Sequence, residues 1–210
     1  TVSGAGTEEI RIHGVEKLSG TTFCCMSDRI EAGTFLAAVA ATHGEVLLRE
    51  VSLPSLQPII AVLQDAGARF MPGAGTLYMD ASKRLKSFYI RTEPHPGFPT
   101  DMQAQMCAVA ATARGESIIT EDIFENRMHH VPELRRAGVD IEVDDRTMRI
   151  TGRRSLLAND FVATELRGGA ALCIAALAAK GQSTVAGVRF IDRGYEHFVE
   201  KLEGLGARIV

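Results

Sequence analysis

MQAQMCAVAATARG, residues 102–115, is an alanine-rich run with almost no polar face. Two similar runs occur elsewhere in the chain, IEAGTFLAAVAATHG at residues 30–44 and RGGAALCIAALAAKG at residues 167–181. A helix that is apolar all round belongs in the interior of a protein. We therefore predict three buried helices, at residues 30–43, 102–114 and 167–180.

The three runs belong to a unit that is repeated along the chain. Gly44, Gly115 and Gly181 close the runs at similar intervals, and a second glycine follows each of them at a nearly constant spacing. The second glycines are Gly67, Gly138 and Gly206. The first set suits the left-handed position that ends a helix, and a second, amphipathic helix is expected to end at each glycine of the second set. The local signals in each copy run strand, helix, strand, helix, strand, strand, with Phe88–Ile90 and Asp160–Val162 among the expected strands.

This repeat predicts one pseudo-threefold α/β domain over residues 27–210, with copies at about 27–91, 92–163 and 164–210 and with strands outside the helices. Residues 1–26 precede the first copy and carry two strand-like runs, Glu9–Ile12 and Phe23–Met26. They are expected to be either a remnant of a preceding domain or a piece that completes the third copy. Because no initiator methionine or secretion signal opens the chain, it reads as an internal fragment.

Composition excludes several classes of protein. The chain has 210 residues, of which 46% are hydrophobic, and a net charge of −3, so it is not disordered and has no broad basic field for nucleic acid. Its apolar runs are shorter than the ~20 residues of a membrane helix. The four cysteines, Cys24, Cys25, Cys107 and Cys173, fall in no metal-binding or disulfide-framework spacing. We expect free thiols in a reducing cytoplasm, with Cys107 and Cys173 as small buried hydrophobes.

Five motifs carry a specific resemblance to a known family, and together they cover essentially the whole chain. They are SDRIEAGTFL (27–36), FPTDMQAQ (98–105), IFENRMHHVPEL (123–134), TELRGGAAL (164–172) and FIDRGYEHFVEKLEGLGARI (190–209). The chain resembles the UDP-N-acetylglucosamine enolpyruvyl transferase (1-carboxyvinyltransferase) family. The resemblance implies an inside-out α/β barrel of three βαβαββ repeats, in which central helices are surrounded by sheets. It also implies a protein of two such domains, of which this chain is similar to the C-terminal half.

The resemblance implies transfer of the enolpyruvyl group of phosphoenolpyruvate to the 3-hydroxyl of UDP-N-acetylglucosamine, with release of phosphate. That reaction is the first committed step of peptidoglycan synthesis, and the family uses no metal or organic cofactor. Its general acid is a cysteine on a loop of the N-terminal domain, so these 210 residues are expected to be inactive alone. A 5-enolpyruvylshikimate-3-phosphate synthase remains an alternative, although the ENRMHH and IDRGYE strings fit it less well. A non-catalytic half that binds a nucleotide sugar is another.

Asp101 is the first candidate for a catalytic residue. It follows a proline-rich loop, residues 94–100, that restricts the backbone. From the residues alone it is either the N-cap of the next helix or a functional carboxylate. The FPTD motif favours the second, because the resemblance implies that this aspartate binds the sugar hydroxyl and acts as its base.

Three arginines, Arg29, Arg167 and Arg193, are placed in or just before the first turn of an expected helix. A cation there opposes the helix dipole, yet beside the free N–H groups it makes an anion site. The alternative for each is a salt bridge, for example with Asp28, Glu165 or Asp192. The resemblance assigns Arg167 and Arg193 to phosphoenolpyruvate and leaves Arg29 open as a hinge residue.

The remaining candidates come from the same motifs. By resemblance, Ile123 and Phe124 line the nucleotide-sugar pocket, Ile123 chiefly through its backbone. Arg127 either orients the site or pairs with Glu125. The resemblance also implies a place near the phosphate site for Glu165, where the family has aspartate. His129 and His130 are expected on a partly exposed helix surface.

Overall fold

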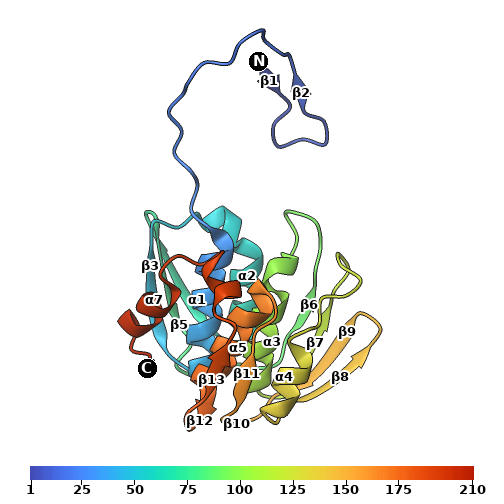
Figure 1. Cartoon of the computed structure of the whole chain (residues 1–210), viewed down its shortest axis with the longest axis vertical. Helices are drawn as coiled ribbons and strands as arrows, with labels where there is room; N and C mark the ends of the chain where they lie inside the picture. Colours follow the sequence, from blue (N-terminus) through green and yellow to red (C-terminus); the bar gives the residue numbers. More distant parts are fainter.

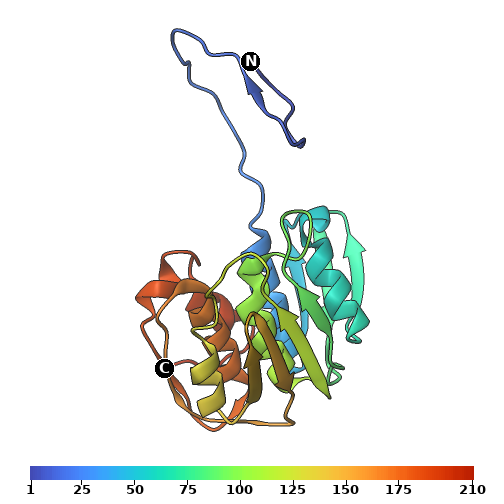
Figure 2. The ribbon, with the colours of Figure 1, turned by 90° about the vertical axis from the view of Figure 1, so that its right-hand side faces the viewer.

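Three helices lie side by side in the middle of the molecule (Figures 1 and 2). The computed structural model describes residues 1–210 and places these helices as α1 (Arg29–Thr42), α3 (Gln103–Thr112) and α5 (Leu166–Ala178), each in contact with the other two. All 10 residues of α3 are buried. The three predicted helices are thus confirmed, because alanine-rich faces without polar groups pack closely on every side.

The strands lie around these helices in separate small sheets. One sheet has the order β3-β5-β4 and is antiparallel, and another has the order β6-β7-β9-β8, in which only β6 and β7 run parallel. Side chains alternate as a half-buried strand requires, so that in β9 Met148 and Ile150 are buried while Arg149 is exposed. The bounds are β3 (Glu45–Arg49), β4 (Arg69–Gly73), β5 (Thr76–Asp80), β6 (Tyr89–Arg91), β7 (Glu116–Thr120), β8 (Asp140–Asp144) and β9 (Thr147–Thr151).

Near the C-terminus the sheets are smaller. β11 (Asp160–Val162) pairs in parallel with β13 (Thr184–Ala186), as β6 pairs with β7, and β10 (Leu156–Leu157) pairs in parallel with β12 (Ala179–Lys180). β13 has no second neighbour in its sheet. The architecture is therefore mixed α/β with helices at the centre, and its strands do not join into a closed barrel.

Residues 1–26 extend away from the rest of the molecule (Figures 1 and 2). Within them β1 (Val2–Ser3) pairs only with β2 (Arg11–Ile12), in an antiparallel hairpin. The prediction of a strand at Phe23–Met26 is wrong, because these residues are exposed and outside any strand. A short apolar run becomes a strand only where a sheet edge accepts it, and here it contacts none.

The remaining helices are α2 (Leu53–Asp65), α4 (Val131–Arg136), α6 (Arg189–Asp192) and α7 (Phe198–Gly204). Gly67, Gly138 and Gly206 follow α2, α4 and α7 with φ of 113°, 83° and 100°, which confirms the second glycine of each copy. At the first helix the prediction for Gly44 is wrong, because His43 takes the left-handed position with φ 60°. Gly115 and Gly181 have positive φ, but α3 and α5 have already ended, with Ala113 and Ala179 as their C-caps.

No helix has both the length and the apolar character needed to cross a membrane. All four cysteines are free thiols, of which Cys107 is buried, Cys173 is half-buried, and Cys24 and Cys25 are exposed.

Candidate functional site

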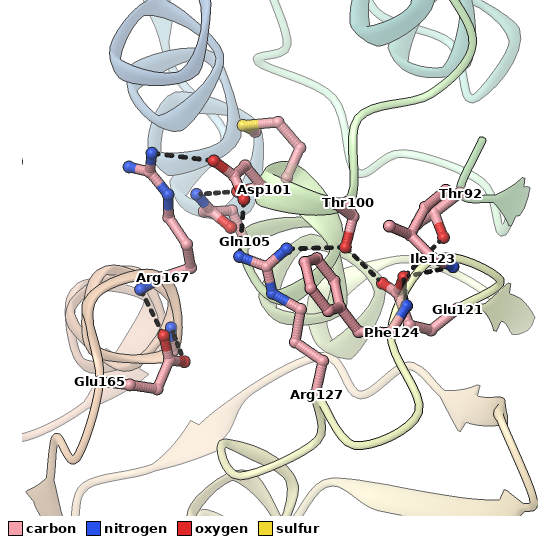
Figure 3. Close-up of polar contacts among 12 residues, drawn as sticks. Thr92, Thr100, Asp101, Gln105, Glu121, Ile123, Phe124, Arg127, Glu165 and Arg167 are labelled. Carbon is pink, nitrogen blue, oxygen red and sulfur yellow. Dashed lines mark hydrogen bonds and ion pairs between the residues drawn. The ribbon is translucent and has the colours of Figure 1, made fainter. Parts of the chain in front are cut away.

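Asp101 lies where the N-terminal ends of α3 and α5 meet the loop that follows β7 (Figure 3). It belongs to η1 (Thr100–Met102), a single 3-10 turn that leads directly into α3. Each oxygen of its carboxylate accepts a hydrogen bond from a different arginine. Arg127 Nη2 donates to Oδ1 at 2.6 Å, and Arg167 Nη2 donates to Oδ2 at 3.1 Å. Two segments far apart in the sequence therefore hold one carboxylate between them.

The carboxylate of Asp101 is available because it does not cap its own helix. The N-cap of η1 is Pro99, which offers no side-chain hydrogen bond. At the other two central helices the N-cap is acidic, with Asp28 accepting from the Ile30 and Glu31 N–H groups and Glu165 from those of Arg167 and Gly168. The alternative that Asp101 is a plain N-cap is therefore wrong.

The charge state of Asp101 follows from its two partners. Partial burial of the carboxyl raises its pKa, but the hydrogen bond from Arg127 and the charges of Arg167 and Arg127 outweigh that effect, so the pKa lies below its ordinary value. The side chain is 39% exposed, so a ligand can reach it. Asp101 is therefore a solvent-accessible carboxylate at neutral pH, held by two cations.

Arg167 is the more enclosed of the two cations. Its side chain is 14% exposed, and its guanidinium lies 5.4 Å from the centre of the Tyr195 ring. Nη2 bonds Asp101, whereas Nη1 is buried and has no hydrogen-bond partner. A buried guanidinium N–H without an acceptor costs free energy, so Arg167 retains donor capacity that an anionic ligand could use.

Arg127 joins Asp101 to the loop after β7. It donates to Thr100 Oγ1 at 2.7 Å as well as to Asp101, and its guanidinium lies 4.9 Å from the centre of the Phe124 ring. The alternative pairing with Glu125 is wrong, because Glu125 lies 3.8 Å from Arg146 instead. Arg127 is thus placed to orient Asp101.

Glu121 is a residue of this site that sequence reasoning missed. It is 1% exposed and accepts hydrogen bonds from Thr92 and Thr100 hydroxyls and from two backbone N–H groups, those of Ile123 and Phe124 (Figure 3). A charged residue at the end of a strand looks solvent-exposed in a sequence. Only the fold shows that four donors converge on it and that it shapes the start of the loop.

Glu121→Gln is expected to destabilise the chain by about 1–3 kcal/mol. The two carboxylate oxygens of Glu121 accept four hydrogen bonds, and glutamine replaces one of these oxygens with an NH2 group, which can only donate. Chemical denaturation of the 210-residue chain would measure the change. Glu125→Gln is the matched control, since the Glu125 side chain is 90% exposed and its replacement is expected to change the free energy of unfolding by less than about 0.5 kcal/mol. Equal effects of the two substitutions would contradict the organising role of Glu121.

Ile123 and Phe124 project from this loop with 37% and 50% of their surfaces exposed. Both backbone N–H groups are already bonded to Glu121 Oε1, at 3.0 and 3.1 Å. A backbone contact from Ile123 to a ligand would therefore have to come from its carbonyl oxygen. The Phe124 ring lies beside Arg127, at the edge of the Asp101 site, whereas Ile123 lies farther away, near Thr92 (Figure 3).

Glu165 acts on the site through the helix that it begins. Its carboxylate accepts from Arg167 N at 2.8 Å and from Gly168 N, and this fixes the first turn from which Arg167 projects. A side chain at Gly168 would collide with the Glu165 carboxylate and crowd His130.

His130 is 2% exposed, so its predicted surface position is wrong, whereas His129 is exposed as expected. Burial lowers the pKa of His130 to about 4 and keeps it neutral.

Two of the predicted arginines are not brought to Asp101. Arg29 Nη1 lies 3.4 Å from His95 Nδ1, beside a cleft of about 260 Å³ between α1, α2 and residues 95–99. Arg193 is exposed and is the C-cap of α6, so its predicted place at a helix start is wrong. The short helix α6 ends where the sequence pattern suggested that a helix would begin.

Comparison with known proteins places this chain in a class. Residues 1–202 match the family described as EPSP synthase (3-phosphoshikimate 1-carboxyvinyltransferase), and the chain belongs to that family. The curated relatives include UDP-N-acetylglucosamine 1-carboxyvinyltransferases from Shewanella baltica and Shewanella woodyi, each 46% identical over 210 residues, which is 100% of this chain and 50% of the relative. The chain thus spans about half the length of the curated relatives it matches.

Solved structures agree with this placement. The enolpyruvyl transferase NikO from Streptomyces tendae has 28% sequence identity and a TM-score of 0.77, over 87% of this chain and 44% of that one. EPSP synthase from Acinetobacter baumannii has 15% identity and a TM-score of 0.60, over 78% of this chain and 40% of that one. The second likeness concerns the fold alone.

Proposed function

We propose that the protein to which these residues belong transfers the enolpyruvyl group of phosphoenolpyruvate to the 3-hydroxyl of UDP-N-acetylglucosamine and releases phosphate. Its place would be the first committed step of peptidoglycan synthesis, in the cytoplasm. The observation that carries the proposal is the Asp101 carboxylate between Arg127 and Arg167. The 46% identity to UDP-N-acetylglucosamine 1-carboxyvinyltransferases supports this choice of acceptor.

The reaction needs a base for the acceptor hydroxyl and cations for the anionic groups of phosphoenolpyruvate. Asp101 would accept the hydroxyl proton as the oxygen attacks the central carbon of the enolpyruvyl group. With both arginines in place the lowered pKa makes Asp101 a weak base. An anion that draws Arg167 toward itself through the unpartnered Nη1 would weaken that cation's hold on Asp101 and raise its basicity.

A proton must also reach the methylene carbon to complete the addition, and a proton must be lost from the resulting methyl group as phosphate leaves, so that the double bond is restored. Burial raises the thiol pKa of Cys107 and of Cys173 to about 12, so neither is suited to donate there. Cys24 and Cys25 lie on the segment that extends away from the site. We propose that the acid comes from a cysteine loop outside these 210 residues and that no metal or organic cofactor takes part.

In this proposal residues 27–210 form one three-repeat domain, an inside-out α/β barrel when complete, and residues 1–26 belong with the preceding domain. The substrates would bind between the two domains. Asp101, Arg127 and Arg167 would then contribute one wall of the site, together with Ile123 and Phe124. Glu165 would act by placing Arg167, while Arg29 and Arg193 would reach substrate only through movement.

Phosphate release measured with the longer protein tests this function. With phosphoenolpyruvate, UDP-N-acetylglucosamine is expected to give turnover and shikimate 3-phosphate to give none, while the 210-residue chain alone releases no phosphate. Shikimate 3-phosphate is the second candidate acceptor because the matched family is described by that substrate. Turnover with shikimate 3-phosphate alone would overturn the proposed acceptor, and turnover by the 210-residue chain would overturn the external acid.

A further inference from the structure

Beneath the candidate site lies a buried polar cluster that none of the roles above uses. Thr34 of α1, Gln105 of α3 and Tyr195, between α6 and α7, are 0%, 0% and 2% exposed. The Thr34 and Tyr195 hydroxyls are 2.8 Å apart, and Gln105 Nε2 lies 3.1 Å from the first and 3.2 Å from the second. Buried polar groups are hydrogen-bonded in nearly all proteins, and here the two hydroxyls and the Gln105 Nε2 group bond one another, while Gln105 Oε1 has no partner.

The direction of these hydrogen bonds can be worked out from the protons available. The Thr34 hydroxyl donates to Ile30 O at 2.8 Å, so the Tyr195 hydroxyl has to be the donor to Thr34. The Gln105 amide donates to Asp101 O at 2.9 Å, which leaves its second proton for Tyr195 or Thr34. A single chain of donors therefore connects the backbone of Asp101 to Tyr195 and onward to α1.

Repeat positions explain why a tyrosine is needed at this point. Thr34 and Gln105 stand at the same place relative to the first glycine of their copies, and the matching residue of the third copy is Ala171. Alanine has no polar group to offer. Tyr195, which comes well after the third copy's central helix, supplies the missing hydroxyl from outside the repeat position.

Tyr195 also contacts Arg167, which forms an ion pair with Asp101. Its ring lies 5.4 Å from the Arg167 guanidinium and packs against the Phe198 ring, at a centroid distance of 4.9 Å. One side chain thus supports Arg167 with its ring and the Asp101 backbone with its hydroxyl, through Gln105.

We propose that Tyr195 is a positioning residue that sets the geometry of the Asp101–Arg167 pair through Gln105 and Thr34. For catalysis this inference rests on the proposed function, but the geometry itself can be tested without turnover. Tyr195→Phe is the informative change. It removes only the hydroxyl, and Gln105 and Thr34 still have each other as partners, so the fold is expected to persist.

The test is a carbon-13 titration of the Asp101 carboxyl in the 210-residue chain. In Tyr195→Phe the Asp101 pKa is expected to rise by about half a unit toward its ordinary value, because the loosened segment spends less time between its two arginines. Tyr78→Phe is the matched control. It also removes a hydroxyl that makes a hydrogen bond, to Glu45 at 2.6 Å on the surface, and should leave the Asp101 titration unchanged. An unchanged Asp101 titration in Tyr195→Phe would overturn the proposal.

Turnover of the longer protein adds a second measurement. Tyr195→Phe is expected to lower kcat about tenfold with KM within about twofold, because a misplaced carboxylate affects the transition state more than substrate binding. A higher KM at unchanged kcat would speak against positioning. If the wild-type longer protein shows no turnover at all, the proposed function fails, while the titration still decides the role of Tyr195.

Discussion

Asp101→Asn is expected to lower kcat of the longer protein about a thousandfold while the fold is retained, because loss of a positioned general base costs about 10²–10⁴ in rate. Asparagine has the shape of aspartate and keeps one oxygen for Arg127 or Arg167. It cannot take a proton, and its NH2 group replaces the oxygen that accepts from the other arginine, so retention of the fold is checked alongside turnover. Phosphate release at saturating substrates is the measurement.

Asp65→Asn is the control for this change. Asp65 is an exposed aspartate at the end of α2, and its replacement should leave kcat within about twofold of the wild type. Near-normal turnover of Asp101→Asn would show that Asp101 only holds the two arginines and that another group takes the proton.

Arg167→Met is expected to lower kcat/KM for phosphoenolpyruvate about a hundredfold, since a charge-assisted hydrogen bond contributes roughly 1.5–3 kcal/mol. The pH profile should change as well. Arg167 helps to hold the Asp101 pKa below its ordinary value, so Asp101 stays ionised until the pH falls through that lowered pKa. Without Arg167 the pKa rises, and activity should disappear at a higher pH as the solution is acidified.

Arg154→Met removes an exposed arginine that is not part of the Asp101 site, and it serves as the control. Its kcat/KM and pH profile should match those of the wild type. If Arg167→Met left the acid limb of the profile where it was, Arg167 would not be coupled to the proton acceptor.

The central helices were predictable because their sequences are apolar in every direction, which only burial satisfies. Phe23–Met26 has a sequence typical of a strand but forms none, because a strand also needs a free sheet edge to pair with, and the sequence of the segment does not show whether one is near. The place of Arg193 depended on α6, a helix of 4 residues with too short a pattern to be recognised. Local periodicity thus identified the long buried helices. It failed for short segments whose secondary structure depends on contacts with other parts of the molecule.

The candidate site was predictable in part. Asp101 and Arg167 come together as their motifs suggested, although the sequence left the partner of Arg127 open. Glu121 and Tyr195 were missed for a different reason. Each has a polar side chain with partners from segments far away in sequence, Thr92 and Thr100 for Glu121 and Thr34 for Tyr195, so no spacing rule could connect them. Buried polar clusters of this kind are visible only in the folded chain.

The proline that begins the 3-10 turn before α3 has a consequence for the symmetry of the molecule. Asp28, Pro99 and Glu165 stand at the same place relative to the first glycine of each copy. Where the residue at that place is acidic, its carboxylate accepts hydrogen bonds from the first N–H groups of its own helix. Where it is proline, the helix start is left uncapped, and the nearby Asp101 faces outward instead. A backbone that repeats three times is in this way made chemically unequal, because at only one of its three equivalent helix starts is a carboxylate bound by arginine side chains instead of by its own helix.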